Sequence, residues 1–358
     1  MTFLENYQKF LGIFELHLKK YLDSLPKDLE NKDVSTQKLI EVSSLAVQGG
    51  GKRLRPYLVS LGYQMASNKP FDAKSVLDAA LAAEIFHTFA LVHDDIIDQS
   101  STRRGQKTPH VLFNEVHTSN SLKGSSEHFG TSMAILTGDL LIAYVTKIIS
   151  NIEADPQTKQ NLNTAFADMF VNLILGQYQD VYQSFDPNRP SEEMIMSTLR
   201  WKSGEYTVEF PLKFGGLLGQ ASDELLGFFA KFSTPIGIAF QLRDDILGIF
   251  SKSTTIGKSN LSDIREGKNT LLIRYAMELA NANQITKLNS ILGKQNADEN
   301  DLIVVQDILT SSGAKAKIEA KILGLSDESK NYISEANIDQ EHKNILSEFC
   351  DFIISRDK

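Results

Sequence analysis

The sequence predicts an all-α fold, and three observations support that prediction. Apolar residues recur at helical spacing over long stretches of the 358-residue chain. Prolines number only nine, few for this length. Alternating runs of β-branched residues bounded by turns, the pattern typical of strands, are nearly absent. The length alone allows two or three domains, or one large helical domain with an extensive core.

The expected helices follow from apolar periodicity and from their start signals. Ser191 follows Pro190, and Ser222 precedes two acidic residues; both serines suit the N-cap position. Pro235 should kink the helix that contains it. Several helices are apolar on more than one face, which is typical of central helices surrounded by others. We expect helices over 75–98, 131–152, 159–183, 191–215, 222–250 and 269–283, and loops at 66–72, 114–130, 184–190 and 251–267.

Composition narrows the function classes. A net charge of -8 argues against a general nucleic-acid binder. Cys350 is the single cysteine, which excludes an internal disulfide framework and fits a reducing, cytoplasmic compartment. The N-terminus lacks a basic region followed by an apolar stretch, so no signal peptide is expected. The most apolar stretch, 133–149, is interrupted by Gly138, Asp139 and Lys147, so we predict no membrane span.

A first acidic cluster, defined as residues 93–98 (HDDIID), ends the apolar helix expected over 75–98. Asp94 and Asp98 are four residues apart and share one helix face, where two carboxylates repel each other unless a cation lies between them. Mg²⁺ prefers oxygen ligands and often bridges to substrate phosphates. Asp95 points about 100° away and would support the site from behind. A solvated acidic helix end is the alternative, and the preceding apolar run argues against it.

His93 beside Asp94 raises a rival interpretation. A His-Asp doublet on a helix is also the metal-binding mark of a class of phosphohydrolases. That chemistry needs further His and Asp ligands on neighbouring helices. The nearest candidate is His87, which faces elsewhere on the helix. The rival is left open by the first cluster, although it does not account for a second one.

A second acidic cluster lies about 150 residues later, in residues 241–248 (QLRDDILG). Buried carboxylates are costly without cations. Basic residues are also clustered, in the loop 49–56 (GGGKRLRP) and at Arg103, Arg104 and Lys107. Glycines allow close backbone approach, and Lys and Arg neutralise phosphate oxygens. Alone, such a loop is more often ordinary surface. Together, these clusters predict one cavity in which metal ions and phosphates cancel the acidic charge.

Six motifs in order, GGGKRLRP, HDDIIDQSSTRRG, LTGDLL, GQYQD, KSGEYT and FQLRDDILGIF, resemble the all-trans isoprenyl diphosphate synthases, or polyprenyl synthetases. The resemblance covers about 45–270. It implies an all-α bundle around a deep central cavity, the isoprenoid synthase fold, in a homodimer. We therefore expect one polyprenyl synthetase domain over 1–358, with a helical C-terminal part over 285–358. The implied partners are an allylic diphosphate and isopentenyl diphosphate, with release of pyrophosphate.

The resemblance also implies roles for individual residues. Asp94, Asp98 and Asp244, with Asp245 behind it, would bind Mg²⁺, three ions per site. Lys202, Ser203 and Gln241 would be catalytic, and released pyrophosphate would take the proton. Gln177 and Asp180 match the polar wall of the site. The allylic diphosphate would be held by Arg103, Lys202, Lys268 and Lys258, with Asp263 nearby; isopentenyl diphosphate would be held by Lys52, Arg55, His87 and Arg104, with Arg53 in the same basic loop.

The chain departs from the family pattern at the second acidic cluster. Gly248 stands where many members have a third aspartate, so one carboxylate is missing four residues after Asp244. The resemblance is closer to a subgroup in which this position is glycine. Ser203 replaces the usual threonine after lysine and keeps a hydroxyl. Of the C-terminal basic residues common in the family, Arg356 and Lys358 are a weak match.

The product length is predicted from the residues before Asp94. Phe89 and Phe86, five and eight positions earlier, lie one turn apart, and either ring could block a growing prenyl tail. By resemblance, an aromatic at the fifth position without an insertion is similar to geranylgeranyl diphosphate synthases, which stop at C20. Farnesyl diphosphate (C15) or a longer product is the alternative.

Two other function classes fit parts of the pattern. A terpene cyclase shares the helical architecture, but its second metal motif has an Asn/Ser/Glu pattern that residues 241–250 lack. A cyclase also has no need of the basic loop for a second diphosphate. A non-catalytic synthase subunit tends to lose the first acidic cluster or its arginines, and this chain keeps both.

Overall fold

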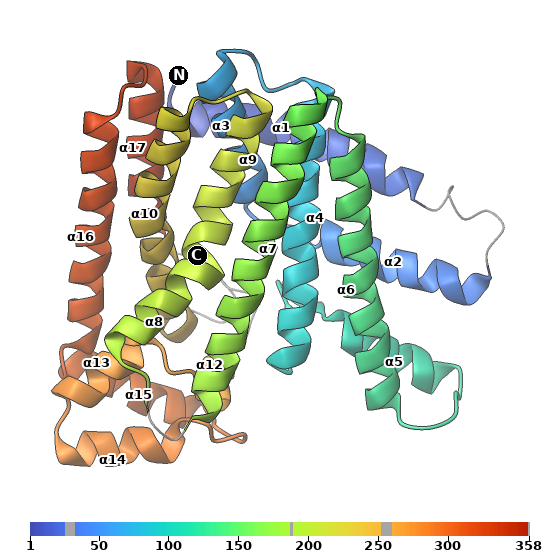
Figure 1. The fold of residues 1–358 in the computed structure, drawn as a ribbon. Helices are drawn as coiled ribbons and strands as arrows, with labels where there is room; N and C mark the ends of the chain where they lie inside the picture. Colours follow the sequence, from blue (N-terminus) through green and yellow to red (C-terminus); the bar gives the residue numbers. More distant parts are fainter. Residues whose placement is uncertain (26–32, 187–188, 252–259, 357–358) are drawn as a thin grey trace. The chain divides into compact units, whose positions relative to one another are not determined.

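The structure of the protein is a computed structural model that describes residues 1–25, 33–186, 189–251 and 260–356. Helices dominate, and the only strands in these ranges form one two-stranded hairpin (Figure 1). The all-α prediction is confirmed. The chain divides into two compact units: an N-terminal unit of Leu4–Asn163 and Phe214–Ala221, and a C-terminal unit of Met1–Phe3, Thr164–Lys213 and Ser222–Lys358. The expected single domain stays a prediction.

The N-terminal unit is built around one apolar helix, α4 (Lys74–Ile97), which packs against α3 (Leu54–Ser67) and α6 (Ser126–Asn151). His93 on α4 meets Gly138 on α6, where an added Cβ would overlap the imidazole, so the glycine of the LTGDLL motif permits this close helix packing. The other elements of this unit are α1 (Phe3–Ser24), α2 (Val34–Gln48), α3 (Leu54–Ser67), β1 (Thr102–Arg103), β2 (Gln106–Lys107), α5 (Pro109–Ser119) and α6 (Ser126–Asn151).

The C-terminal unit is built around α10 (Asp223–Phe250), which packs against the π-helix η2 (Arg200–Glu209) and against α16 (Ala314–Glu335) and α17 (Gln340–Ile354) (Figure 1). Phe3 joins this unit, with its ring 5.7 Å from Phe349 and 5.3 Å from Phe352. The other elements are α7 (Pro156–Phe185), α8 (Glu192–Leu199), η2 (Arg200–Glu209), α9 (Phe210–Leu218), α12 (Leu261–Glu266), α13 (Leu271–Leu279), α14 (Ala282–Ile291), α15 (Glu299–Ser311), α16 (Ala314–Glu335) and α17 (Gln340–Ile354); α7 and α9 each run from one unit into the other.

The expected elements are largely found, with four corrections. The helix expected over 269–283 ends at Leu279 as α13, and α14 begins at Ala282. Ser191 and Ser222 are N-caps, accepting from the backbone N–H groups of Met194 and Leu225. The helix expected over 191–215 is α8, then the π-helix η2, then α9. The loop expected at 114–130 is wrong in part, because α5 reaches Ser119 and α6 begins at Ser126. The loop expected at 251–267 contains α12.

Three described helices, α4, α6 and α10, are long and apolar enough to cross a membrane by length and composition alone. The most apolar windows of α4 and α10 are 72% and 56% buried in the protein, and that of α6 is 39% buried. Packing against other helices therefore accounts for much of this apolar surface. The expectation of no membrane span stays a prediction.

Candidate active site

The first acidic cluster lies at the end of α4. Asp98 follows the last helical residue, but its backbone N–H still donates to the Asp94 carbonyl at 2.8 Å. The helical geometry therefore continues through Asp98, and the two residues keep the one-turn spacing predicted from the sequence. Asp95 is buried, as its different direction on the helix predicts.

Arg103 contacts two of the three aspartates of this cluster, Asp94 and Asp95. Its Nε donates to both carboxylate oxygens of Asp95 at 2.9 Å, and its Nη2 lies 3.5 Å from Asp94 Oδ2. Burial lowers the pKa of Arg103, but the hydrogen bond to Asp95 and the charges of Asp95, Asp94 and Asp98 raise it above its ordinary value. The cation is thus fixed beside the predicted metal ligand Asp94.

A short hairpin positions Arg103 and Arg104. Arg103 pairs with Gln106, and the two turn residues, Arg104 and Gly105, both have positive φ, 53° and 75°. Positive φ at both positions is the requirement of a type I′ two-residue turn. The turn places the Arg104 guanidinium against Gly51, where an added Cβ would lie 2.7 Å from Nη1. Gly51 therefore leaves room for Arg104 at the basic loop.

Three of the residues predicted to hold isopentenyl diphosphate, Arg55, His87 and Arg104, lie together in the N-terminal unit. Arg55 Nη1 lies 3.3 Å from His87 Nε2. Burial lowers the pKa of His87 well below its ordinary value, and the charges of Arg55, Arg104, Arg103 and Arg53 lower it further. His87 is therefore neutral at physiological pH and acts as a hydrogen-bonding group rather than as a charge.

Arg53 differs from its neighbours in the basic loop, because its side chain points into the protein. Its Nη1 donates to Glu84 Oε1 at 2.5 Å and its Nε to Glu15 Oε1 at 2.9 Å. The side chains of Arg53 and Glu84 are each only 3% exposed. This burial argues against direct contact between Arg53 and a diphosphate, the role expected from the sequence. Sequence reasoning also missed Glu84, whose signal was a lone carboxylate within an apolar helix.

Phe86 and Phe89, the predicted floor of the prenyl cavity, are both buried on α4. Their ring centroids are 5.4 Å apart, and Phe89 also packs edge-on against His93 at 4.8 Å. The two rings therefore form one aromatic layer directly preceding the first acidic cluster along the helix. Their role in setting product length stays a prediction.

In the C-terminal unit, the predicted catalytic residues are linked by hydrogen bonds. Ser203 Oγ donates to Gln241 Oε1, and Gln241 Nε2 donates to Asp245 Oδ1, both at 2.9 Å. Close approach of η2 and α10 makes this chain of contacts possible. A Cβ on Gly237 would lie 2.5 Å from the Gly204 Cα, so glycine is needed where the two helices cross.

Lys202 is placed by a second contact with a predicted site residue. Its Nζ donates to Asp180 Oδ2 on α7 at 2.6 Å. Gly176 of the GQYQD motif allows α7 to approach η2, because an added Cβ would lie 2.8 Å from the Lys202 backbone nitrogen. Gln177 follows Gly176 and is partly buried. The motifs GQYQD and KSGEYT are therefore one packing unit.

Of the remaining predicted residues of this unit that the structure describes, Lys268 lies near the C-terminal end of α7, Asp244 on α10 and Asp263 on α12. Lys268 Nζ pairs with Glu266 at 2.8 Å, and the next residue, Asn269, donates to the Gln183 carbonyl of α7 at 2.8 Å. Asp244 accepts from the Nη2 of Arg356, a contact that the sequence did not predict. Lys258 lies outside the described residues.

The donor set of the acidic clusters fits a hard divalent cation. Each cluster supplies two aspartates and leaves other coordination positions to water and phosphate, the arrangement that Mg²⁺ favours. Within the described ranges, no group of three or more His, Cys, Asp and Glu side chains could hold a metal by itself. His93 instead lies 3.3 Å from the Ile135 carbonyl. The phosphohydrolase interpretation therefore lacks its ligand set in the part of the chain described.

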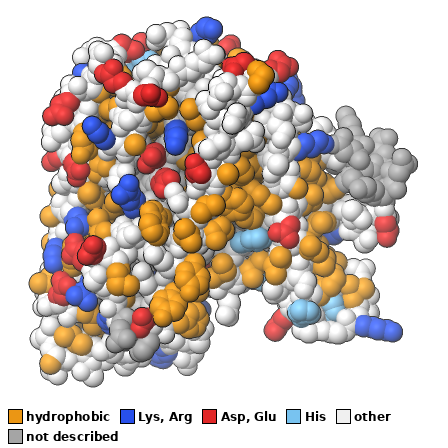
Figure 2. All heavy atoms as spheres, in the orientation of Figure 1, with side chains coloured by type: hydrophobic (Ala, Val, Ile, Leu, Met, Phe, Trp, Pro, Cys, Tyr) orange, Lys and Arg blue, Asp and Glu red, His pale blue; other side chains and the backbone are white. Residues whose placement is uncertain are grey.

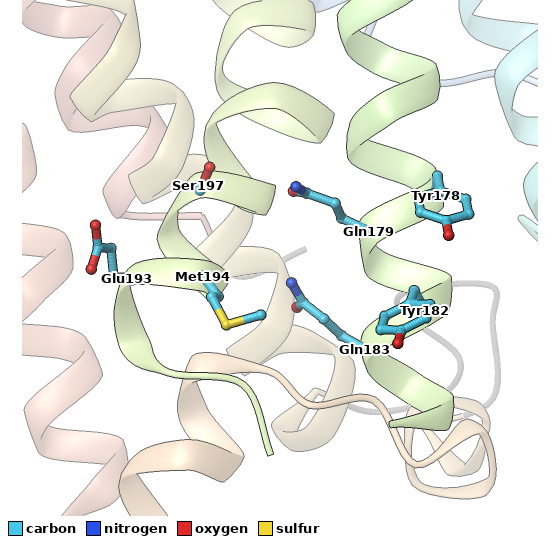
Figure 3. Close-up of a pocket in the computed structure, with 7 residues that line it drawn as sticks. All are labelled: Tyr178, Gln179, Tyr182, Gln183, Glu193, Met194 and Ser197. Atoms are coloured by element: carbon cyan, nitrogen blue, oxygen red, sulfur yellow. The ribbon is translucent and has the colours of Figure 1, made fainter. Parts of the chain in front are cut away.

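A separate open pocket of about 500 Å³ lies between α7 and α8 (Figure 3). Gln179 and Gln183 point from α7 toward α8, whereas Tyr178 and Tyr182 point to the other side. The tyrosines belong to an apolar stripe on α7 whose members are 48–85% exposed, and Figure 2 shows apolar side chains gathered along this face. The stripe consists of Val171, Ile174, Leu175, Tyr178, Tyr182 and Phe185.

Comparisons with known proteins agree with these motifs. A family model described as polyprenyl synthetase matches residues 36–309. The chain is 30% identical to a short chain isoprenyl diphosphate synthase of Methanocaldococcus jannaschii, over 96% of each chain. It is 29% identical to a geranylgeranyl diphosphate synthase of Methanosarcina mazei, over 90% of each. The geranylgeranyl pyrophosphate synthase from Corynebacterium glutamicum, solved in complex with isoprenyl diphosphate and magnesium, is similar with a TM-score of 0.92 and 30% identity, over 97% of this chain and 99% of that one. The chain belongs to the polyprenyl synthetase family.

Proposed function

We propose that the protein is a head-to-tail prenyltransferase that condenses an allylic diphosphate with isopentenyl diphosphate and releases pyrophosphate. One observation carries this proposal. A chain of this family has two acidic clusters, fixed cations beside them, and a separate basic loop. Two relatives named as isoprenyl and geranylgeranyl diphosphate synthases match nearly the whole chain. A second diphosphate substrate explains why the chain carries the basic loop as well as the acidic clusters.

The chemistry begins with cleavage of the allylic carbon–oxygen bond, whose electron pair leaves with pyrophosphate. The resulting allylic cation is attacked by the double bond of isopentenyl diphosphate, and a carbon–carbon bond forms. Loss of a proton to the released pyrophosphate then creates the new double bond. Arg103, Lys202 and Lys268 would stabilise the charge that grows on the leaving group, which is electrostatic catalysis by preorganised cations.

The acidic clusters would hold the metal. Asp94 and Asp98 form one pair of oxygen ligands, and Asp244 with Asp245 forms the other. Mg²⁺, three ions per site in this proposal, would neutralise the diphosphate and assist its departure. Arg103 beside Asp94 and Gln241 beside Asp245 orient these carboxylates through the contacts described above.

Isopentenyl diphosphate would bind at the basic loop. Lys52, Arg55 and Arg104 supply positive charge, and the neutral His87 supplies a hydrogen bond without a further cation. Ser203 and Gln241, already linked at 2.9 Å, would lie near the carbocation as neutral polar groups. Neutral groups suit this position because they do not attack a cation as a carboxylate would.

We propose geranylgeranyl diphosphate, C20, as the product. Phe89 on α4 would stop the growing chain, with Phe86 in the layer behind it. Similar chains include two named geranylgeranyl synthases, one of them a crystal structure with 30% identity. Farnesyl diphosphate is the C15 alternative, in which the same aromatic layer stops elongation one isopentenyl addition earlier.

We also propose that the α7 stripe is a homodimer interface. An exposed apolar stripe on one helix can meet its own copy across a two-fold axis, because an isologous interface uses the same surface twice. Tyrosines at its centre are typical of interface cores. Leu175→Glu should yield monomers in light scattering after size-exclusion chromatography. The matched control is Ile303→Glu, an equally exposed apolar residue on α15, which should leave the mass unchanged.

The function is tested by incubating purified protein with Mg²⁺, labelled isopentenyl diphosphate and C5, C10 or C15 allylic starters. Chromatography of the dephosphorylated products gives chain length directly. We expect all-trans C20 alcohol as the main product. A cyclic hydrocarbon would indicate a terpene cyclase, and the absence of any elongation would contradict the proposal.

A further inference from the structure

We propose that Arg53 and Glu84 are positioning residues that hold the basic loop in the conformation that binds isopentenyl diphosphate. This inference rests on the proposed function, since it concerns the second substrate of that reaction. Neither residue touches the substrate in this account. The pair acts through Lys52 and Arg55, which lie on either side of Arg53 along the loop.

The first support is that the contacts of the Arg53 guanidinium are directed into the protein. Nη1 donates to Glu84 and, at 3.4 Å, to the Gly50 carbonyl, while Nη2 donates to the Val47 carbonyl at 3.4 Å. Nε donates to Glu15. Every nitrogen of the side chain therefore has a protein acceptor. Contact with a diphosphate would require breaking a buried ion pair, which leaves Glu84 charged and unpaired.

The second support is the backbone of the loop. Gly50, Gly51 and Arg53 all have positive φ, at 81°, 133° and 49°. A non-glycine residue in this region is strained and persists only where its surroundings fix it. Arg53 is fixed by Glu15 from α1 and Glu84 from α4, so the contacts of its side chain offset the strain of its backbone conformation.

Tyr7 on α1 holds the same loop at a second point. Its hydroxyl donates to the Lys52 carbonyl. Burial raises the pKa of Tyr7 to about 12, and the nearby Glu84 raises it in the same direction, so the hydroxyl stays a donor. The loop is thus clamped from α1 and α4 at two consecutive residues, and the next helical turn carries Arg55 to His87.

The third support is electrostatic. Arg53, Arg55, Arg103 and Arg104 all act on His87, so four positive charges share one region. Removal from water lowers the pKa of Arg104, Glu84 raises it, and the other arginines lower it. Glu84 is therefore a buried negative charge that offsets the mutual repulsion of Arg53, Arg55 and Arg104 before a diphosphate binds, as Asp95 does for Arg103.

If Glu84 acts only through its charge, Glu84→Gln should change diphosphate binding in one direction, and if Glu84 positions the loop, in the opposite direction. If only charge matters, removing a carboxylate should tighten diphosphate binding. If position matters, the loop loosens and the KM for isopentenyl diphosphate rises, by about 10- to 100-fold for a misplacement near 1 Å. We expect the rise, with kcat and the KM for the allylic substrate within about twofold of wild type.

The matched control is Asp78→Asn, which removes another partly buried ion pair on α4, with His17 and Lys74, away from the loop. Its KM for isopentenyl diphosphate should be unchanged. Arg53→Lys keeps the positive charge but loses the forked donors of the guanidinium. Its KM for isopentenyl diphosphate should therefore lie between those of wild type and of Glu84→Gln. The double variant Arg53→Met/Glu84→Leu restores the net charge and leaves no unpaired buried ion, since Glu15, the other partner of Arg53, is 51% exposed. It should therefore fold even where the single variants do not.

Two measurements, diphosphate binding and elongation, distinguish a failure of this inference from a failure of the proposed function. Binding of inorganic diphosphate, measured by calorimetry, needs no catalysis and should weaken in Glu84→Gln and in the double variant. A folded double variant with wild-type KM and wild-type diphosphate affinity would overturn the positioning role, as would tighter binding in Glu84→Gln. A wild-type protein that binds diphosphate but elongates no starter would contradict the proposed function and leave the positioning result to be judged by calorimetry.

Discussion

Arg356 donates from its Nη2 to the carboxylate of Asp244, a residue 112 positions earlier in the chain. The Arg356 side chain is buried against the ring of Phe240, at 4.1 Å, and Arg243 donates to the Arg356 carbonyl at 2.8 Å. The last described residue of the chain is therefore anchored on α10. The positive charge of Arg356 therefore lies beside the carboxylate of Asp244, the proposed metal ligand of the second acidic cluster.

Arg356→Gln should lower the Mg²⁺ concentration needed to bind inorganic diphosphate. The guanidinium competes with a metal for Asp244, and a partly exposed ion pair corresponds to an effect of about 2- to 5-fold. Thermal-shift titrations with Mg²⁺ at fixed diphosphate measure this midpoint. Lys330→Gln, which removes a surface pair with Asp351, is the control. A higher Mg²⁺ requirement in Arg356→Gln would show that the arginine assists the site instead.

Phe89→Ala should lengthen the products. Removing the ring opens space directly before the first acidic cluster, so elongation continues past C20 under the same assay. Phe71→Ala is the control, because it deletes a similarly buried ring of the same unit, packed on Phe10. Both variants should lose about 3–5 kcal/mol of stability. An unchanged product profile in Phe89→Ala would refute the floor assignment.

Stability should fall as the pH rises from about 4.5 to about 7, in part through Glu209 on η2. Burial, and then the neighbouring charge of Glu205, raise the pKa of Glu209 to about 7, above its ordinary value of 4.5. The folded protein therefore holds this proton where the unfolded chain has lost it, and the cost of ionising it reaches at most about 3 kcal/mol above pH 7. In urea unfolding at pH 5 and pH 8, Glu209→Gln should show a smaller difference between the two. An equal difference in variant and wild type would contradict the assignment.

Gly237→Ala should destabilise the protein and weaken catalysis together. The new Cβ would meet the Gly204 backbone at 2.5 Å and force η2 from α10, which separates Ser203 from Gln241. Gly227→Ala is the matched control on the same helix, since nothing lies within 4 Å of its Cβ. The control should gain up to about 1 kcal/mol from better helix propensity. Denaturant unfolding measures the free energy of unfolding of both variants. Equal stability would show that the close crossing of η2 and α10 does not require glycine at position 237.

The sequence predicts the helices well where periodicity is long and caps are explicit. Ser191 and Ser222 show this, since each hydroxyl makes the expected cap. The π-helix was missed because the sequence spacing of apolar residues does not reveal backbone hydrogen bonds between residues five apart, such as that from the Phe210 N–H to the Glu205 carbonyl. The hairpin was missed because its strands have two residues each, too few for a period-2 pattern.

The site residues were accessible from motifs, but their partners were not. Lys202, Gln241 and Arg103 stand in recognisable motifs. Their contacts join residues from 4 to 38 positions apart, and only the fold brings the more distant ones together. Arg53 shows the limit most clearly, because the basic loop gives no sign that one of its cations turns inward. Glu84 on the neighbouring helix was the available signal.

The most direct test of the account compares Asp94→Asn and Asp244→Asn with wild type in the elongation assay at saturating Mg²⁺. The proposed reaction requires both acidic clusters. Each variant should therefore lose about 10²- to 10³-fold in kcat, the usual cost of removing one preorganised electrostatic group. Both variants should stay folded, since each substitution is isosteric and partly exposed. Wild-type turnover in either variant would contradict the claim that the two clusters serve one site.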